Sequence, residues 1–347
     1  MNEATTTPQK TRIHLWDNLK FVLILLVVFG HFIHTYNNDT ILSEKLYVFI
    51  LSFHMPTFLF ISGLFSKKTI RNKNYYKCFD YFVLYIFSKL CIFVCKVITE
   101  EKYKLSLWEE SSVPWYAFAL MVFVFFTILL QRIHPVYLFI FAILMGCISG
   151  YDPSLGDQLV ASRILVFYPF FLAGYFLDGE KIIAFFSKIY WKFFGLAIYL
   201  LWFLYIWNSK NAPEFWHPLV TGRESLNKTG INYFWYRAIY YGVIFILIFA
   251  AIALTPSRKT CISAMGSRSV QVFTLHRGLI YIFYDKYPAE ELLAYWGAPK
   301  TLVLLFGLSI LLTLFLSLSF LSKPLQWILH PKRINTETQK APDSIES

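Results

Sequence analysis

Long apolar runs constrain this chain more than any other feature of its sequence. A helix that crosses a bilayer needs about 20 mostly apolar residues. Ten runs come near or reach that length, at roughly 18–36, 46–65, 79–98, 115–130, 135–149, 164–178, 193–208, 232–254, 269–284 and 300–321. The runs at 135–149 and 164–178 are short, which favours tilted or partly re-entrant segments. We therefore predict an all-α fold, a polytopic membrane helix bundle with about ten transmembrane helices.

The composition and the cysteines agree with a membrane domain. Charged residues make up 15% of the chain, whereas a soluble domain carries about 25%. The five cysteines lie mostly within or beside apolar runs, form no Cys-x-x-Cys pair and indicate no disulfide framework. Residues 1–11 are polar and lack the apolar core of a signal peptide, so we expect the first run to be retained as a helix.

The connections between the runs differ in their content of basic residues. Those at 1–17, 66–78, 131–134, 178–192, 255–268 and 322–347 hold 18 Lys and Arg, and those at 37–45, 99–114, 150–163, 209–231 and 285–300 hold 9. Basic residues concentrate in cytoplasmic loops, so both termini are predicted to be cytoplasmic. The same bias accounts for the net charge of +11 without a nucleic-acid partner. We predict a cytoplasmic segment at 1–17, a membrane domain at 18–322 and a cytoplasmic tail at 323–347 that ends in disorder.

The first run carries three ionisable residues on one helical face. His31 follows Lys20 by 11 residues, a rotation of only about 20°, and Asp17 lies on the same side. Along the axis His31 stands about 16 Å beyond Lys20, too far for Asp17 to orient it. One interpretation is a functional polar stripe. The other is a surface pair of Asp17 with a snorkelling Lys20, and a histidine that bonds a neighbouring helix.

The second run contains a histidine close to a proline, in the stretch Phe53-His54-Met55-Pro56. Pro56 should kink the helix and free backbone carbonyls near His54. In the predicted orientation His54 and His31 lie about 12 and 8 Å from the outer end, so they can meet at one depth. The alternative is an inter-helix hydrogen bond without chemistry. A metal site is not expected, because no third ligand stands at a suitable spacing.

Further polar and aromatic residues open helices from the predicted outer side. Trp115 and Tyr116 begin the fourth run and Arg163 begins the sixth. They fit a sugar site, and equally an aromatic belt and a headgroup anchor. The ninth run carries His276 and Arg277, to which the sequence assigns no role.

Several motifs spread over nearly the whole membrane region carry a family resemblance. They are Asp17-Asn18-Leu19-Lys20 with His31, Phe53-His54-Met55-Pro56 running to Ile61-Ser62-Gly63, Trp115-Tyr116-Ala117-Phe118-Ala119-Leu120, Ser162-Arg163 leading to Phe167-Tyr168-Pro169-Phe170-Phe171 and Gly174, and Gly266 to His276. In these residues the chain resembles acyltransferase family 3, the integral-membrane enzymes that O-acylate bacterial surface sugars. Within that family it is similar to the fucose 4-O-acetylase branch.

The resemblance implies transfer of an acyl group, most often acetyl from acetyl-CoA, to a sugar hydroxyl. Such a hydroxyl needs a base near pH 7, and histidine suits that task. We predict His31 as the base, His54 as a second proton carrier or orienting group, and Arg163 as a stabiliser of the oxyanion or the sugar. The acceptor would be a sugar or lipid-linked glycan of the inner membrane, contacted by Ser62, Trp115 and Tyr116.

The phosphates of CoA need cationic contacts on the cytoplasmic face. The candidates for donor binding are Arg12, Asp17, Lys20, Lys67 and Lys68. Lys20 stands where many family members have arginine, which keeps the charge but loses the bidentate fork.

Two other classes of function compete with an enzyme. A transporter or flippase of a lipid-linked glycan would also need a polar intramembrane stripe, but its usual signature is a pair of similarly interrupted helices in two halves, which the sequence lacks. A structural or sensor protein would not need His31, His54 and Arg163 together.

Overall fold

The computed structural model describes residues 13–35, 40–99, 105, 112–151, 160–223 and 233–329. Arg12 and most of the predicted tail lie outside these residues. Every regular element in the described part of the chain is a helix. The α-helices are α1 (His14–His34), α2 (Ile41–Leu51), α3 (His54–Arg71), α4 (Tyr76–Ile98), α5 (Trp115–Leu130), α6 (Pro135–Ile148), α7 (Ala161–Phe176), α8 (Gly179–Phe186), α9 (Ile189–Asn208), α10 (Ala212–Thr221), α11 (Tyr233–Leu254), α12 (Ser263–Gly266), α13 (Ser269–Lys286), α14 (Ala289–Trp296), α15 (Ala298–Leu316) and α16 (Ser322–Leu329). The all-α prediction is confirmed.

Each of the ten predicted runs coincides with helical structure. Six helical segments are long and apolar enough to cross a bilayer, namely α1, α2 with α3, α4, α9, α11 and α15. The helices α5, α6 and α7 are apolar but shorter, in agreement with the short runs in the sequence. The chain is therefore a multi-pass membrane protein, and the number of ten spans stays a prediction.

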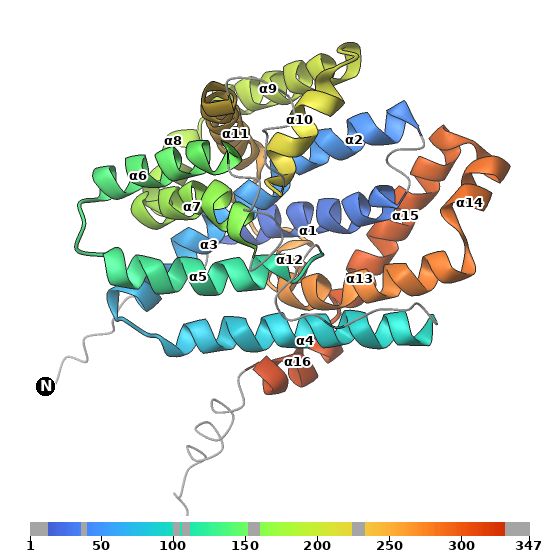
Figure 1. Cartoon of the computed structure of the whole chain (residues 1–347), viewed down its shortest axis with the longest axis horizontal. Coiled ribbons are helices and arrows are strands. Elements are labelled where there is room, and N and C mark those ends of the chain that lie inside the picture. Colours follow the sequence, from blue (N-terminus) through green and yellow to red (C-terminus); the bar gives the residue numbers. More distant parts are fainter. Residues whose placement is uncertain are drawn as a thin grey trace, which may run out of the picture.

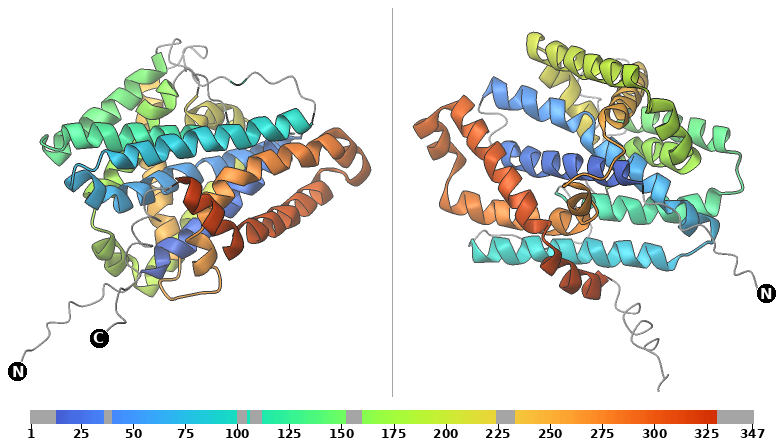
Figure 2. Two further views of the ribbon diagram at one scale, coloured as in Figure 1. Left: turned by 90° about the horizontal axis from the view of Figure 1, so that it is seen from below. Right: turned by 180° about the vertical axis from the view of Figure 1, so that it is seen from behind.

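Helix α1 lies inside the bundle (Figure 1). It packs against α2 and α3, from the N-terminal part of the chain, and against α12, α13 and α15, from the C-terminal part. Figure 2 shows this arrangement from behind. Both apolar and polar side chains of α1 are buried, including Asp17 and Asn18. A polar residue in this surrounded helix must find its partners within the protein, because lipid offers none.

The second run is interrupted next to His54, where the sequence predicts a kink. Helix α2 ends at Leu51 and α3 begins at His54, so the break falls at residues 52–53 and Pro56 sits in the first turn of α3. Proline is tolerated in a first turn, where its missing N–H would have no intrahelical partner. At the break, the carbonyl oxygen of Ile50 accepts from the backbone N–H of Phe53 at 3.4 Å and lies 2.8 Å from Nδ1 of His54.

Helices α3 and α7 pack closely along their lengths, and glycines permit it. A Cβ on Gly63 would collide with the carbonyl of Phe171, and one on Gly174 would collide with the carbonyl of Phe60. This reciprocal contact lets the two backbones touch, as small residues do in membrane helix pairs. It fixes His54 and Arg163, which stand on these two helices, relative to each other.

Candidate functional site

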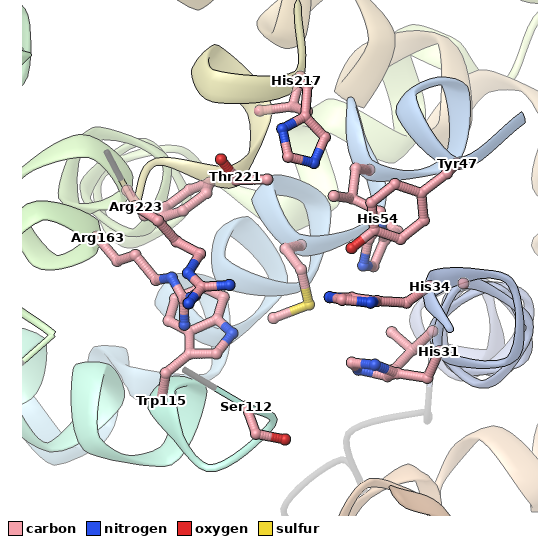
Figure 3. Close-up of a pocket in the computed structure, with 16 residues that line it drawn as sticks. His31, His34, Tyr47, His54, Ser112, Trp115, Arg163, His217, Thr221 and Arg223 are labelled. Carbon is pink, nitrogen blue, oxygen red and sulfur yellow. The ribbon is translucent and has the colours of Figure 1, made fainter. Parts of the chain in front are cut away.

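A cavity of about 230 Å³ lies at the end of the bundle that carries His31. Figure 3 shows three histidines and Tyr47 on one side of it and two arginines with Trp115 on the other. The lining residues come from α1, α2, α3, α5, α7 and α10 and from the segments beside them. Those with polar or ionisable groups are His31, His34, Tyr47, His54, Ser112, Trp115, Arg163, His217, Thr221 and Arg223. The predicted catalytic residues His31, His54 and Arg163 are thus brought together around one cavity.

His54 is held in one tautomer by the break between α2 and α3. The Nδ1 atom lies 2.8 Å from the carbonyl oxygen of Ile50, and a carbonyl only accepts, so Nδ1 must carry the hydrogen. Nε2 of the neutral ring is then an acceptor. The side chain is 6% exposed and lines the cavity. It can therefore accept a hydrogen bond from a hydroxyl that enters.

His31 is half-buried and is supported from behind by α13. The Arg277 guanidinium donates from Nη1 to the backbone oxygen of His31, at 3.2 Å. The ring of His276 lies 5.2 Å from the ring of His31, centroid to centroid. His31 thus faces the cavity on one side and α13 on the other.

On the arginine side of the cavity, the guanidinium of Arg163 lies over the aromatic ring of Trp115. The guanidinium carbon of Arg163 lies 5.0 Å from the ring centroid of Trp115, a separation at which cation and ring attract each other. Arg163 is 5% exposed. Its neighbour Ser162 donates to the carbonyl of Gly222 at 2.7 Å, which ties the end of α10 to α7 and places Arg223 beside Arg163 (Figure 3).

Sequence reasoning missed His34, Tyr47, His217 and Arg223. His34 follows His31 by three residues, a spacing that puts both on one helical face. His217 stands on α10, within a stretch that the sequence predicts as a loop. The helix had signals, because Pro213 and Glu214 fill its first turn and Gly222 ends it with φ of +60°. Tyr47 has no sequence signal that separates it from the chain's other tyrosines.

A second cavity of about 650 Å³ lies at the other end of α1. It is lined by Asp17, Lys20 and Lys67 among the predicted donor-binding residues. Lys20 pairs with Asp17 at 2.8 Å, and Lys67 donates to the carbonyl of Leu177. Lys68 is exposed and does not line the cavity, and Arg12 lies outside the described residues.

Carboxylates share this second cavity with the lysines. Asp178 and Glu180 line it at the start of α8. The backbone N–H groups of Glu180 and Lys181 donate to the Asp178 side chain and hold its pKa below the usual value. Asp178 therefore stays negative at neutral pH, and two lysines face three acidic side chains in this lining.

Two of the three predicted acceptor contacts lie away from the His31 cavity. Ser62 and Tyr116 bond each other, with 2.7 Å between their hydroxyl oxygens, and neither lines the His31 cavity. Trp115, the third predicted acceptor contact, does line it. In the Asp17-Asn18 motif, Asn18 is fully buried and donates to the carbonyls of Pro256 and Arg258 at 2.8 and 3.0 Å. Asn18 therefore anchors the connection between α11 and α12.

The comparison with protein families assigns the chain. A family model described as an acyltransferase domain matches residues 13–321, which include both cavities and every helix through α15. The chain belongs to this acyltransferase family. It is a membrane acyltransferase. Neither a curated protein nor a solved structure matches it.

Proposed function

We propose that this acyltransferase moves an acetyl group from acetyl-CoA to a hydroxyl of a cell-surface glycan or its lipid-linked precursor, in the inner membrane of the cell. The observation that carries the proposal is the meeting of His31, His54 and Arg163 around one cavity. A base, a second proton carrier and a fixed cation are the groups that acyl transfer to a hydroxyl uses. The resemblance to the fucose 4-O-acetylase branch supports a sugar as acceptor.

In the proposed reaction His31 takes the proton of the acceptor hydroxyl as its oxygen attacks the thioester carbonyl. The new C–O bond forms and the charge on the carbonyl oxygen is stabilised by Arg163. The C–S bond then breaks, and the departing thiolate takes the proton from His31. Nε2 of His54 accepts a hydrogen bond from the hydroxyl or from a water molecule, and so orients it. Trp115 offers an apolar face to the sugar ring.

The donor nucleotide would bind at the opposite end, in the cavity that Lys20 and Lys67 line. The distance along α1 from Lys20 to His31 is about 16 Å, a length that an extended pantetheine arm can span. The carboxylates of Asp17, Asp178 and Glu180 weaken phosphate binding in this cavity. The two lysines therefore need a further cation, for which we propose Arg12, because Lys68 does not line the cavity. This arrangement makes the Lys20 end cytoplasmic, in agreement with the Lys and Arg bias of the sequence.

A neighbouring cavity offers an alternative place for the nucleotide. It has a volume of about 570 Å³ and is lined by Lys192 and Arg258, with Ser187, Ser257 and Thr255. No carboxylate belongs to its described lining. It lies beside the connection that Asn18 anchors, and therefore at the Lys20 end of α1.

The test is direct transfer by the purified protein. Radiolabelled acetyl-CoA is incubated with the detergent-solubilised protein and with glycan extracted from the host. In parallel, the mass of the glycan from cells with and without the gene is measured by mass spectrometry. We expect label in the glycan and a mass difference of acetyl groups between the two strains. If cells without the gene display less glycan at the surface but that glycan keeps its acetyl groups, the result would instead support a flippase.

A further inference from the structure

His276 is a buried histidine for which the reaction described so far has no use. Its side chain is completely buried on α13. Nδ1 lies 2.8 Å from the carbonyl oxygen of Val272, one turn earlier. Because the carbonyl accepts, Nδ1 carries the hydrogen and Nε2 of the neutral ring is an acceptor. Within the described part of the chain, Nε2 finds no hydrogen-bond donor.

A buried acceptor without a donor costs free energy, and such groups are rare in native proteins. This free energy is recovered if a neighbouring group donates a hydrogen bond to Nε2 of His276 at some step of the reaction. The ring of His31 is 5.2 Å from that of His276, centroid to centroid, and the two planes are inclined by 42°. The two rings are not hydrogen-bonded as they stand. Atoms of an imidazole lie about 1.2 Å from its centroid, so rings that turned a nitrogen toward each other would bring the two nitrogens to about 2.8 Å, a hydrogen-bond distance.

The surroundings of His31 make such an acceptor useful. Once His31 has taken a proton, both of its nitrogens are donors and its charge must be stabilised. The guanidinium of Arg277 is bonded to the His31 carbonyl and adds a second positive charge nearby. Further ionisable groups around the same cavity are His34, Tyr47, His54, His217, Arg163 and Arg223. Carboxylates are absent from the described lining, so a neutral imidazole is the acceptor that α13 presents.

We propose that His276 is the positioning residue of His31, an inference that rests on the proposed function. One nitrogen of His31 takes the proton of the acceptor hydroxyl, and the N–H on its other nitrogen donates to Nε2 of His276. No proton crosses to His276, which keeps its Nδ1 hydrogen throughout. The hydroxyl O–H bond breaks, the His31 N–H bond forms, and the same proton later passes to the thiolate of CoA. His276 thus orients the base and stabilises its charged form, the part that a carboxylate plays beside other catalytic histidines.

Two substitutions separate this role from packing. In His276→Gln the amide can place an oxygen near the position of Nε2 and keep an acceptor for His31. In His276→Asn the amide can keep the donor to Val272 but has no atom at the position of Nε2. Thr274→Val is the matched control, because Thr274 is buried on the same helix and its hydroxyl also donates one turn back, to Val270 at 2.8 Å.

The experiment measures acetyl transfer from acetyl-CoA to host glycan, with kcat and KM for both substrates and the melting temperature in detergent. For His276→Asn we expect a loss of about 10- to 100-fold in kcat, with both KM values and the melting temperature close to wild type. His276→Gln should recover most of the loss, and Thr274→Val should behave as wild type.

Other results overturn the inference in distinguishable ways. Equal activity losses in the Asn and Gln variants, or a loss that follows the melting temperature, would make His276 a packing residue. Wild-type kcat in His276→Asn would remove it from the reaction while leaving the proposed function intact. A wild-type protein that transfers no acetyl group would overturn both proposals.

Discussion

The cavities at the two ends of α1 differ in size, in charge and in the burial of their polar groups. The His31 cavity is about 230 Å³ and is lined by four histidines and two arginines, with His54 and Arg163 buried. The Lys20 cavity is about 650 Å³ and mixes lysines with carboxylates on long, partly exposed side chains. Fixed groups in a small, buried space suit a reaction, because they need little rearrangement as charge develops. Flexible charges in a larger space suit the binding of a charged cofactor.

The largest expected effect concerns the side of the membrane to which each cavity belongs. With the five cysteines replaced by serine, single cysteines would be placed at exposed positions near each end, Lys210→Cys and Asn74→Cys. A membrane-impermeant maleimide added to whole cells should label position 210 fully and position 74 only after permeabilisation. The reverse labelling pattern would reverse the orientation of the protein in the membrane and place the Lys20 cavity on the outer side.

The second prediction removes the base from the small cavity. His31→Ala should lower acetyl transfer by about 10² to 10⁴, while membrane insertion and the melting temperature in detergent stay near wild type, because a half-buried side chain gives up little packing. Steady-state transfer of label from acetyl-CoA to glycan measures the effect. Turnover near the wild-type rate would exclude His31 from the reaction.

The third prediction changes the large cavity. Lys20→Ala should raise the KM for acetyl-CoA about tenfold and leave kcat and the acceptor KM nearly unchanged, because a lysine that binds the donor equally in ground and transition states affects only KM. Lys20→Arg should keep most of the activity.

Arg258→Ala is the comparison variant for the neighbouring cavity. If the KM for acetyl-CoA rises in Arg258→Ala and not in Lys20→Ala, the nucleotide binds next to Arg258, and Lys20 serves only its pair with Asp17.

The smallest effect is expected for a residue pair that belongs to neither cavity. Tyr116→Phe removes one hydroxyl of the pair with Ser62, which lines neither cavity. The loss should be about 1 kcal/mol of stability, visible as a lower melting temperature, with kcat and both KM values close to wild type. Trp115→Leu provides the contrast. Its loss of the aromatic ring that contacts the Arg163 guanidinium should raise the KM for the acceptor. A large kinetic defect in Tyr116→Phe would return the tyrosine to the acceptor site.

Hydropathy predicted the helices, because the length of an apolar run is a local property of the chain. The meeting of His31 and His54 was also within reach, since two antiparallel helices and a rise per residue are enough to compare depths. Pro56 predicted an interruption near His54, and the break falls at residues 52–53. The sequence did not show that Pro56 itself would stand in the first turn of a new helix, a position that proline tolerates.

The rest of the site depends on contacts that are distant in sequence. His217 and Arg223 reach the cavity because α10 folds back and Ser162 holds its end, and no local pattern encodes that return. Ser62 and Tyr116 were grouped with the acceptor site by resemblance, but their hydroxyls satisfy each other. The contact of His276 with His31 likewise joins residues that are 245 positions apart.

The central claim is that an acetyl group enters from the Lys20 end and is transferred at His31. The most direct measurement uses sealed membrane vesicles of both orientations, given radiolabelled acetyl-CoA from outside. Vesicles with the cytoplasmic face outward should label their glycan, right-side-out vesicles should not, and His31→Ala should abolish the signal in the first kind. Equal labelling in both orientations, or label that persists in His31→Ala, would contradict the claim.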